Sequence, residues 1–332
     1  MKVRECTRVC VHMGGGRVID PSTTLRASIC VPVGSGLRVA EVNFTQGDRV
    51  STRLMAVHKH NDWVSDTIAW HGWWEIRGPS EFLNGLAGIG RHARLPRPGG
   101  TFLDIGANIG YYTLMFADRG DRVIAIEPMA RNRAAIQATL CMNPDLRARV
   151  RIVAAALGTA ADVADGVSCV MRPQVQRNLG NGVLECGRNH TCRSPEPPSA
   201  DTLTQRTGMS LTLAQWRHLP CEEVPLRPLD AVLAELKPAN VKTAKIDIEG
   251  HECLALAGGE SIFTLYRPRL MVAEWKAAHV AACMRKLATR HGYIYGRVWG
   301  ADKNVALWDD DRGTKRPKRV YESHVTRPTS AP

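Results

Sequence analysis

The chain has 332 residues, of which 44% are hydrophobic, and a formal net charge of +12. That content is enough to bury a substantial core. No stretch approaches the roughly 18 consecutive apolar residues of a membrane-spanning helix, and the first thirty residues lack the continuous apolar core of a signal peptide. A cytoplasmic location is therefore the default expectation, although a chain without its targeting segment would look the same.

The charge does not by itself define a partner. Positive residues are spread along the chain, and the one dense run, KRPKR at 315–319, is typical of a solvated tail. Nuclear localisation and binding to anionic lipid are its alternative interpretations.

The cysteine pattern leaves two interpretations open. None of the ten cysteines forms a C-x-x-C pair, which argues against a zinc ribbon. Four of them fall in one irregular region and are either disulfide-bonded there or free thiols: Cys169, Cys186, Cys192 and Cys221. Without an export signal, free thiols are at least as well supported. Glycosylation sequons begin at Asn43 and Asn189, but about one is expected by chance, so they do not decide the compartment.

The N-terminal part, residues 1–95, contains short β-type runs followed by a tryptophan-rich segment, DWVSDTIAWHGWWE, at 62–75. This pattern predicts a β-hairpin and a helix that form an extension packed over the rest of the protein.

From residue 101 onward, short apolar runs alternate with longer helical segments. Strands are predicted at 101–105, 122–127, 150–157, 241–248 and 269–275, and helices after Gly110 and at 130–143, 226–236, 251–259 and 277–292. Two last strands, 293–300 and 304–308, are close enough to form a hairpin. This order predicts a doubly wound, Rossmann-like α/β sheet that is mostly parallel, with the final strand antiparallel.

Two segments do not follow that alternation. Residues 158–226 interrupt the predicted domain, 96–310, with a long region rich in Cys, Pro, Gly and Asn that shows no sustained period. Such a connection is either a functional lid or disordered. Residues 311–332 form a basic tail, which we expect to be flexible.

A glycine-punctuated loop follows the first predicted strand of this domain. In FLDIGANIGYYTLMFA (102–117), the pattern is Asp104, Gly106, Asn108, Gly110. A strand, a tight turn and a helix N-terminus form a nucleotide site. A pyrophosphate beside Asp104 would be repelled by about 4 kcal/mol at ~4 Å and an effective dielectric near ~20. S-adenosylmethionine has no phosphate and carries an ammonium and a sulfonium, so it is the predicted cofactor.

Further residues complete the predicted cofactor site. Glu127 ends the second strand, where its carboxylate is placed to accept hydrogen bonds from ribose hydroxyls, although a solvated strand-end residue is the alternative. Of Tyr111 and Tyr112, we expect one to cover the cofactor and the other to pack in the core. The remaining members of the predicted site are Ala107, Pro128 and Ala156.

The segment DIEGHE at 247–252 supplies the candidate catalytic residues. Methyl transfer to a hydroxyl needs alignment, and it also gains from a base. Asp247 is a candidate base or holder of cofactor and acceptor. Glu249 is a candidate base or a partner of a helix dipole. His251 is a proton acceptor or a hydrogen-bonded residue of the first helical turn. The cluster has too few ligands to predict a metal site.

Three other residues are candidates for contact with the acceptor. Trp74 and Glu75 could form a wall for a sugar-like molecule, although anchoring of the N-terminal extension is the commoner role of such an aromatic cluster. Glu274 ends the fifth strand and faces the same edge of the sheet by topology. It is expected to position the acceptor or to pair with a basic neighbour.

Taken in order, the segments FLDIGANIGYYTLMFA, VIAIEP, VAAALG, LRPLDAVL, KIDIEGHECLALAGG and PRLMVAEW resemble the FkbM-type S-adenosylmethionine-dependent methyltransferases. The resemblance covers roughly residues 100–310 and implies a class I methyltransferase fold. It also implies methyl transfer to oxygen, often a hydroxyl of a sugar or polyketide, so the expected partner is a small-molecule or glycan acceptor.

Two other functions compete with this one. A methyltransferase of nucleic-acid bases typically carries an acidic or amide residue, Pro-Pro and an aromatic residue after the fourth strand. Here that position reads Asp247-Ile-Glu-Gly, so a nucleic-acid partner is not expected. A fold that binds cofactor or a partner without turnover is the other alternative, against which the intact Asp104, Glu127 and Asp247 argue. The sequence does not indicate an oligomeric state.

Overall fold

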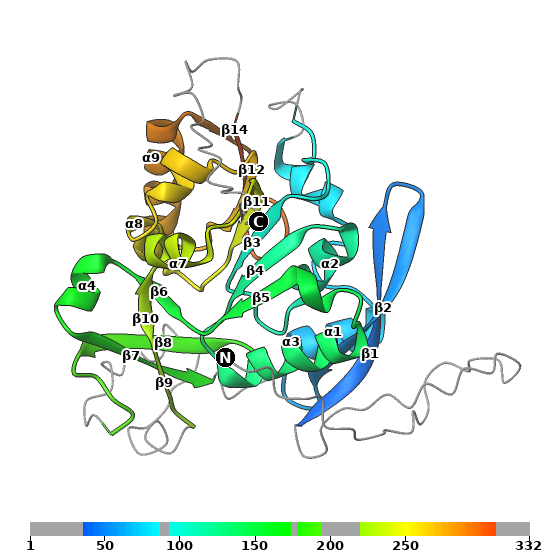
Figure 1. The fold of residues 1–332 in the computed structure, drawn as a ribbon, viewed down its shortest axis with the longest axis horizontal. Coiled ribbons are helices and arrows are strands. Elements are labelled where there is room, and N and C mark those ends of the chain that lie inside the picture. Colours follow the sequence, from blue (N-terminus) through cyan, green and yellow to red (C-terminus); the bar gives the residue numbers. More distant parts are fainter. Residues whose placement is uncertain (1–35, 87–92, 174–177, 194–219, 310–332) are drawn as a thin grey trace, which may run out of the picture.

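The computed structural model describes residues 36–86, 93–173, 178–193 and 220–309. Its centre is a seven-stranded sheet with strand order β13-β14-β12-β11-β3-β4-β5 (Figure 1). The strands are β3 (Thr101–Ile105), β4 (Arg122–Ile126), β5 (Val150–Val153), β11 (Val241–Ile246), β12 (Leu270–Glu274), β13 (Tyr293–Tyr295) and β14 (Asn304–Asp309).

The strand order confirms the predicted doubly wound α/β architecture. The chain runs outward from β3 through β4 to β5, returns to the other side of β3 as β11, and continues to β12. These five strands are parallel, whereas β14 is antiparallel to both β12 and β13. The reversal of direction falls between β3 and β11, and sheets of this type bind ligands beyond the carboxyl ends of strands at such a point.

Helices cover both faces of the sheet, as its apolar strands require. The helices are α2 (Tyr111–Arg119), α3 (Ala130–Met142), α7 (Leu229–Leu236), α8 (Glu252–Ala257) and α9 (Ala278–His291). Side chains alternate along each strand, so Phe102 packs with α2 and α3, and Leu103 packs with α7, α8 and α9. Burial of both faces explains why the central strands are nearly continuous hydrophobic runs.

The N-terminal extension packs on the α2 and α3 side. It comprises a hairpin of β1 (Leu37–Gln46) and β2 (Arg49–His58), the helix α1 (Trp63–His71) and the short 3-10 helix η1 (Pro79–Leu86). Phe44 of β1 meets the ring of Tyr111 edge-on at 5.5 Å between centroids. The side chain of Asp62 caps α1 by accepting a hydrogen bond from the Ser65 backbone N–H at 2.9 Å.

The insertion contains more regular structure than the sequence indicates. In Figure 1 its strands lie apart from the central sheet, as a three-stranded antiparallel sheet of order β8-β7-β9. Its elements are α4 (Ala160–Ala164), β7 (Val167–Pro173), β8 (Gly182–Arg188) and β9 (Glu222–Val224). The expectation of an irregular region is therefore wrong for these residues. The interpretation of its cysteines is also settled, because Cys169 is bonded to Cys186 and Cys192 to Cys221.

Two predicted elements are divided in the structure. The third predicted strand, 150–157, becomes β5 in the central sheet and β6 (Ala156–Gly158), which leaves that sheet. The predicted helix at 226–236 begins as β10 (Leu226–Pro228), which pairs in parallel with β6, and becomes α7 only at Leu229. Pro228 explains the second change, because a proline disfavours the helical conformation of the residue before it.

No helix in the described part of the chain is both long and apolar enough to cross a membrane. The basic tail at 311–332 and residues 1–35 lie outside the described residues.

Candidate active site

The glycine loop joins the ends of β3 and β11. Gly106 has a φ of +85°, and a Cβ placed on it would lie 1.8 Å from the carbonyl oxygen of Asp247. The Asp247 backbone N–H donates to the Ile105 carbonyl at 2.9 Å. Only glycine tolerates both the left-handed conformation and this close approach. The loop therefore brings the predicted cofactor residues and the predicted catalytic residues to one edge of the sheet.

Hydrogen bonds of the remaining loop residues hold the loop, which follows β3, against the end of β4. The backbone N–H of Asn108 donates to Oε2 of Glu127 at 2.8 Å, and the Asn108 side chain accepts from the Ile109 backbone N–H at 2.7 Å. Ala107 is buried, and its N–H donates to the carbonyl of Ile126 at 3.1 Å. Gly110, with a φ of +90°, is the N-cap residue that precedes α2.

Asp104 lies at the bottom of this arrangement and is only 1% exposed. Its Oδ2 accepts a hydrogen bond from the Thr113 hydroxyl at 2.6 Å, whereas its Oδ1 is buried without a hydrogen-bond partner in the part of the chain that the structure describes. Burial raises the pKa of Asp104 to about 6, against the opposing effects of Thr113 and Lys245. A buried acceptor atom without a hydrogen-bond donor costs free energy. Binding of a donor or a cation to Oδ1 would remove that cost.

Glu127 follows β4 and is also buried. Its Oε1 accepts from the Met129 backbone N–H at 2.8 Å and from Nδ2 of Asn132 at 3.3 Å. Burial raises the pKa of Glu127 to about 7, although these donors favour its ionised form. Pro128 lies between the two contacted segments and is half-buried. The carboxylate thus organises the end of β4, and its spare lone pairs are the ones that a ribose hydroxyl would use.

The sequence analysis missed Lys245, which lies at the centre of the site. It is 3% exposed, and its Nζ is 2.5 Å from Oδ2 of Asp247. The same Nζ lies 4.5 Å from the centroid of the Tyr112 ring, and Lys245 pairs in register with Asp104 across β11 and β3. The signal was a lysine within the apolar strand VKTAKIDI, because a buried lysine almost always has an anionic partner.

The charges around Lys245 explain why it stays protonated. Burial alone lowers its pKa, but the carboxylates of Asp247 and Glu75 outweigh that effect and raise the pKa above its ordinary value. The hydroxyl of Tyr112 donates a hydrogen bond to Glu75. Burial raises the pKa of Glu75 to about 8, although Lys245 opposes this.

Trp74 and Glu75 bring the N-terminal extension to this edge of the sheet. Trp74 is partly buried and packs against the core on the α2 and α3 side, which is the anchoring role considered for the aromatic cluster. Glu75 has a φ of +53°, and its side chain meets Tyr112 of α2. Tyr111, the other tyrosine, donates from its hydroxyl to the carbonyl of Ile76 at 2.8 Å.

Glu249 and His251 follow Asp247 in the loop between β11 and α8. Because β11 ends at Ile246, the strand does not extend far enough for its alternation to place both carboxylates. Glu249 has a φ of +56° and an exposed side chain, and desolvation by its surroundings together with the charge of Asp247 raises its pKa. His251 precedes the first residue of α8, and its backbone N–H lies 3.3 Å from the carbonyl of Ile248.

Glu252 has a structural role in the same loop. It is fully buried, and its Oε1 accepts hydrogen bonds from the backbone N–H groups of Ile248 at 3.0 Å and Gly250 at 3.2 Å. The side chain therefore holds the loop that presents Glu249.

Glu274 adds a carboxylate at the end of a third strand, β12. It is the last residue of β12 and is 3% exposed, with its Oε1 3.4 Å from Nζ of Lys276. Ala273 pairs with Ile246, so Glu274 lies beside Asp247 at the carboxyl edge. Burial and the charge of Asp247 raise the pKa of Glu274 to about 8. Three adjacent strands, β12, β11 and β3, thus bring carboxylates to one face of the site.

Residues 178–182 of the insertion, which we call the clasp, lie against the glycine loop. A Cβ on Gly180 would lie 2.8 Å from the side-chain oxygen of Asn108 and 2.9 Å from that of Asp62. The Gly180 N–H donates to Oδ1 of Asp62 at 2.7 Å, and its carbonyl accepts from Nδ2 of Asn132 at 2.7 Å. The clasp therefore touches the extension, the cofactor loop and α3 together.

The clasp also reaches the catalytic loop. Nδ2 of Asn181 donates to Oε1 of Glu249 at 2.5 Å. From the sequence, the insertion was either a functional lid or disordered, and Asn181 was not identified because its contact depends on the fold of β7 and β8.

Ala156 is the predicted cofactor residue that stands apart from these contacts. It lies in β6, where its N–H donates to the carbonyl of Pro225 at 2.9 Å. It packs in a small apolar cluster with Met129 and Met171, which links the end of β4 to the insertion. Within the described residues, no group of three or more His, Cys, Asp or Glu side chains is arranged to hold a metal ion.

The strand order and the glycine turn after β3 are those expected of the Rossmann-like fold of class I methyltransferases. The model of the methyltransferase FkbM domain matches residues 104–295, which is more than half of the chain, and the protein belongs to this family. No curated protein matches the chain in sequence.

Solved structures of methyltransferases are similar to the chain at low identity. The C-terminal domain of precorrin-6Y C5,15-methyltransferase from Rhodobacter capsulatus is 18% identical, with a TM-score of 0.36, over 70% of this chain and 89% of that domain. The precorrin-6y C5,15-methyltransferase of Geobacter metallireducens GS-15 is 12% identical, with a TM-score of 0.33, over 76% and 93%. The METTL16 methyltransferase domain is 11% identical, with a TM-score of 0.34, over 69% and 64%.

Proposed function

We propose that the protein is an S-adenosylmethionine-dependent O-methyltransferase whose acceptor is a hydroxyl of a sugar, a glycan or a small metabolite. The observation that carries this proposal is the buried Oδ1 of Asp104, which has no hydrogen-bond donor among the described residues and lies beside the glycine turn. A cation at this position removes the cost of the unpaired acceptor. A phosphate there would add a like charge.

The residues of the loop fit S-adenosylmethionine. Asp104 would hold the ammonium group, and Glu127 would accept from the ribose hydroxyls while Asn108 and Met129 fix its orientation. Gly106 and Gly110 allow the backbone to approach closely, and Ala107, Tyr112, Pro128 and Ala156 line the remainder in this proposal. The sulfonium of the bound molecule supplies a methyl group already activated for displacement.

In this proposal, two carboxylates of the catalytic loop have different roles. Asp247 is held by the ammonium of Lys245 at 2.5 Å, so its role is to orient the acceptor hydroxyl as a fixed charge. Glu249 has a raised pKa, which makes it a stronger base than an ordinary glutamate, and we assign to it the proton of the acceptor. His251 is the second candidate for that proton. Alignment supplies much of the rate enhancement, and a base adds about 10²–10⁴-fold.

The acceptor would enter from the side where the extension meets the sheet. Trp74, Glu75 and Glu274 are the proposed contacts, since an aromatic face and carboxylates are the groups that bind the apolar faces and hydroxyls of a sugar. The clasp contacts Glu249, so it would close the site around the acceptor.

Release of S-adenosylhomocysteine from S-adenosylmethionine, measured with a panel of sugars, glycans and small hydroxyl compounds, tests the activity. We expect release with at least one acceptor. Asp247→Asn should depress turnover more than donor affinity, and Glu249→Gln should remove the rise of kcat/KM with pH. Donor binding without release for every acceptor would instead favour a catalytically silent protein. Unchanged turnover in Asp247→Asn would refute its catalytic role.

A further inference from the structure

Disulfide bonds occur between helices of the central domain as well as in the insertion. Cys253 of α8 is bonded to Cys283 of α9, in addition to the two bonds of the insertion. Disulfides form and persist mainly in oxidising compartments, such as the secretory pathway, and are rare in the cytosol. The three bonds between described residues, in two structural regions, therefore point away from the cytoplasmic location that is the default expectation from the sequence.

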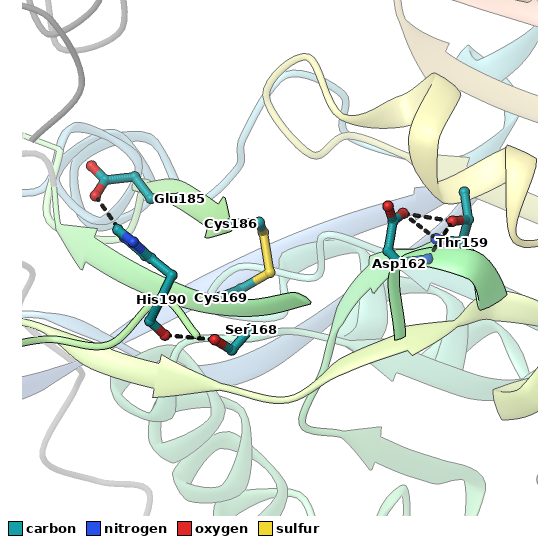
Figure 2. Close-up of a disulfide and its surroundings, with 7 residues drawn as sticks. All are labelled: Thr159, Asp162, Ser168, Cys169, Glu185, Cys186 and His190. Carbon is teal, nitrogen blue, oxygen red and sulfur yellow. Dashed lines mark hydrogen bonds and ion pairs between the residues drawn. A yellow bond between two sulfur atoms is a disulfide. The ribbon is translucent and has the colours of Figure 1, made fainter. Parts of the chain in front are cut away.

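The sequon at Asn189 lies next to one of these bonds. Asn189 follows the last residue of β8, is exposed, and has a φ of +53°. Figure 2 shows the neighbouring side chains: the Ser168 hydroxyl donates to the carbonyl of His190 at 2.7 Å, and the His190 ring lies 3.5 Å from Glu185. Cys169 and Cys186, which are directly opposite each other in β7 and β8, join the two strands beneath this turn. The turn is thus fixed at the surface, with its asparagine exposed to solvent.

The other sequon lies in a different environment. Asn43 is in the middle of β1, where its side-chain oxygen accepts a hydrogen bond from the Thr52 hydroxyl at 2.7 Å. Its backbone N–H donates to the carbonyl of Gly72 at 2.9 Å. The side-chain oxygen of Asn43 is already used across the hairpin and the residue lies within a strand, whereas sequons that are modified lie in surface loops.

We propose that the chain folds in an oxidising secretory compartment and carries an N-linked glycan on Asn189. The new bond joins Nδ2 of Asn189 to the anomeric carbon of a lipid-linked oligosaccharide. The bond from that carbon to the lipid pyrophosphate breaks, the pyrophosphate leaves, and Nδ2 loses one proton. Each disulfide forms as two thiols lose two protons and two electrons to the thiol–disulfide oxidant of the compartment.

The glycan is tested on the endogenous chain, captured from its own cells with an antibody. Peptide N-glycosidase in heavy-oxygen water should convert the peptide that contains Asn189 to a labelled, deamidated form, and it should increase the mobility of the whole chain. In eukaryotic cells that express the full chain behind an added signal peptide, Asn189→Gln and Thr191→Val should each abolish that mobility change, whereas Asn43→Gln should leave it intact. Whole-cell extracts are used, so a misfolded variant is still scored.

Thiol alkylation under denaturing, non-reducing conditions tests the compartment. The six cysteines of the three described bonds should resist alkylation in the endogenous chain and react only after reduction. An endogenous chain without label at Asn189, or with these six thiols free, would overturn the proposal. So would a mobility change that is lost in Asn43→Gln rather than in Asn189→Gln.

Discussion

The central sheet and the insertion are stabilised in different ways. The strands of the sheet are parallel and buried on both faces between helices, so apolar burial dominates there. The insertion is a small antiparallel sheet with few core side chains, and two disulfides hold it. Small units that cannot build a sufficient core commonly depend on such bonds. The comparison teaches that a two-sided apolar core holds the sheet whose carboxyl edge bears the candidate site, while disulfides hold the smaller insertion that contacts it.

Replacement of the buried lysine tests the sheet most strongly. Lys245→Met leaves the carboxylates of Asp104, Asp247 and Glu75 without their shared cation, and removal of one partner of a buried ion pair costs about 3–5 kcal/mol. We expect that loss in the free energy of unfolding from denaturant titrations. Lys286→Met, on the exposed side of α9, is the matched control and should change stability little. Equal stability of the two variants would show that the charge of Lys245 is not needed.

Removal of one disulfide should affect the insertion alone. The bond between Cys169 and Cys186 spans 17 residues, and a loop of about that size is stabilised by about 3 kcal/mol. In the double variant Cys169→Ser/Cys186→Ser, the opening free energy of β7 and β8, measured by hydrogen exchange, should fall by about that amount. The amides of β3 and β4 should exchange as before. Parallel acceleration in those strands would contradict the division into two regions.

The difference between the sheet and the insertion also explains which strands can be predicted from the sequence. The strands 101–105, 122–127, 241–248 and 269–275 are predicted nearly to the residue, because burial on both faces makes them apolar runs next to glycine or proline. The strands β7 and β8 escape notice because their inward positions include Arg172 and Glu185, which are buried polar residues that break the apolar alternation.

Some residues of the candidate site can likewise be predicted from the sequence, and others cannot. The carboxylates of Asp104 and Asp247 follow from the strand ends, since the topology brings neighbouring carboxyl ends together. Lys245 was not predicted because the sequence alone does not show which residues of a strand lie next to a charged side chain. The clasp was concealed because the contact between Asn181 and Glu249 joins residues 68 positions apart in the chain.

A smaller change in local stability is expected at the clasp, where the insertion contacts the loop that follows β11. Asn181→Ala removes the hydrogen bond to Glu249, which contributes about 1 kcal/mol. Exchange of the Leu179 and Gly180 amides should accelerate about fivefold, since about 1.4 kcal/mol corresponds to tenfold. Amides of β3 serve as the internal control. Unchanged exchange at both positions would mean that the clasp is held by Asp62 and Asn132 without Asn181.

Calorimetric titration with S-adenosylmethionine tests the central claim most directly. Burial raises the pKa of Asp104 to about 6, so its ionised form, which attracts the donor, is lost as the pH falls through that value. The affinity should therefore drop about tenfold between about pH 7.5 and about pH 5. Asp104→Asn should bind the donor more weakly by about 1–3 kcal/mol and lose this part of the pH dependence. Failure of the wild-type chain to bind the donor, together with uptake of NAD or a nucleoside triphosphate, would contradict the account.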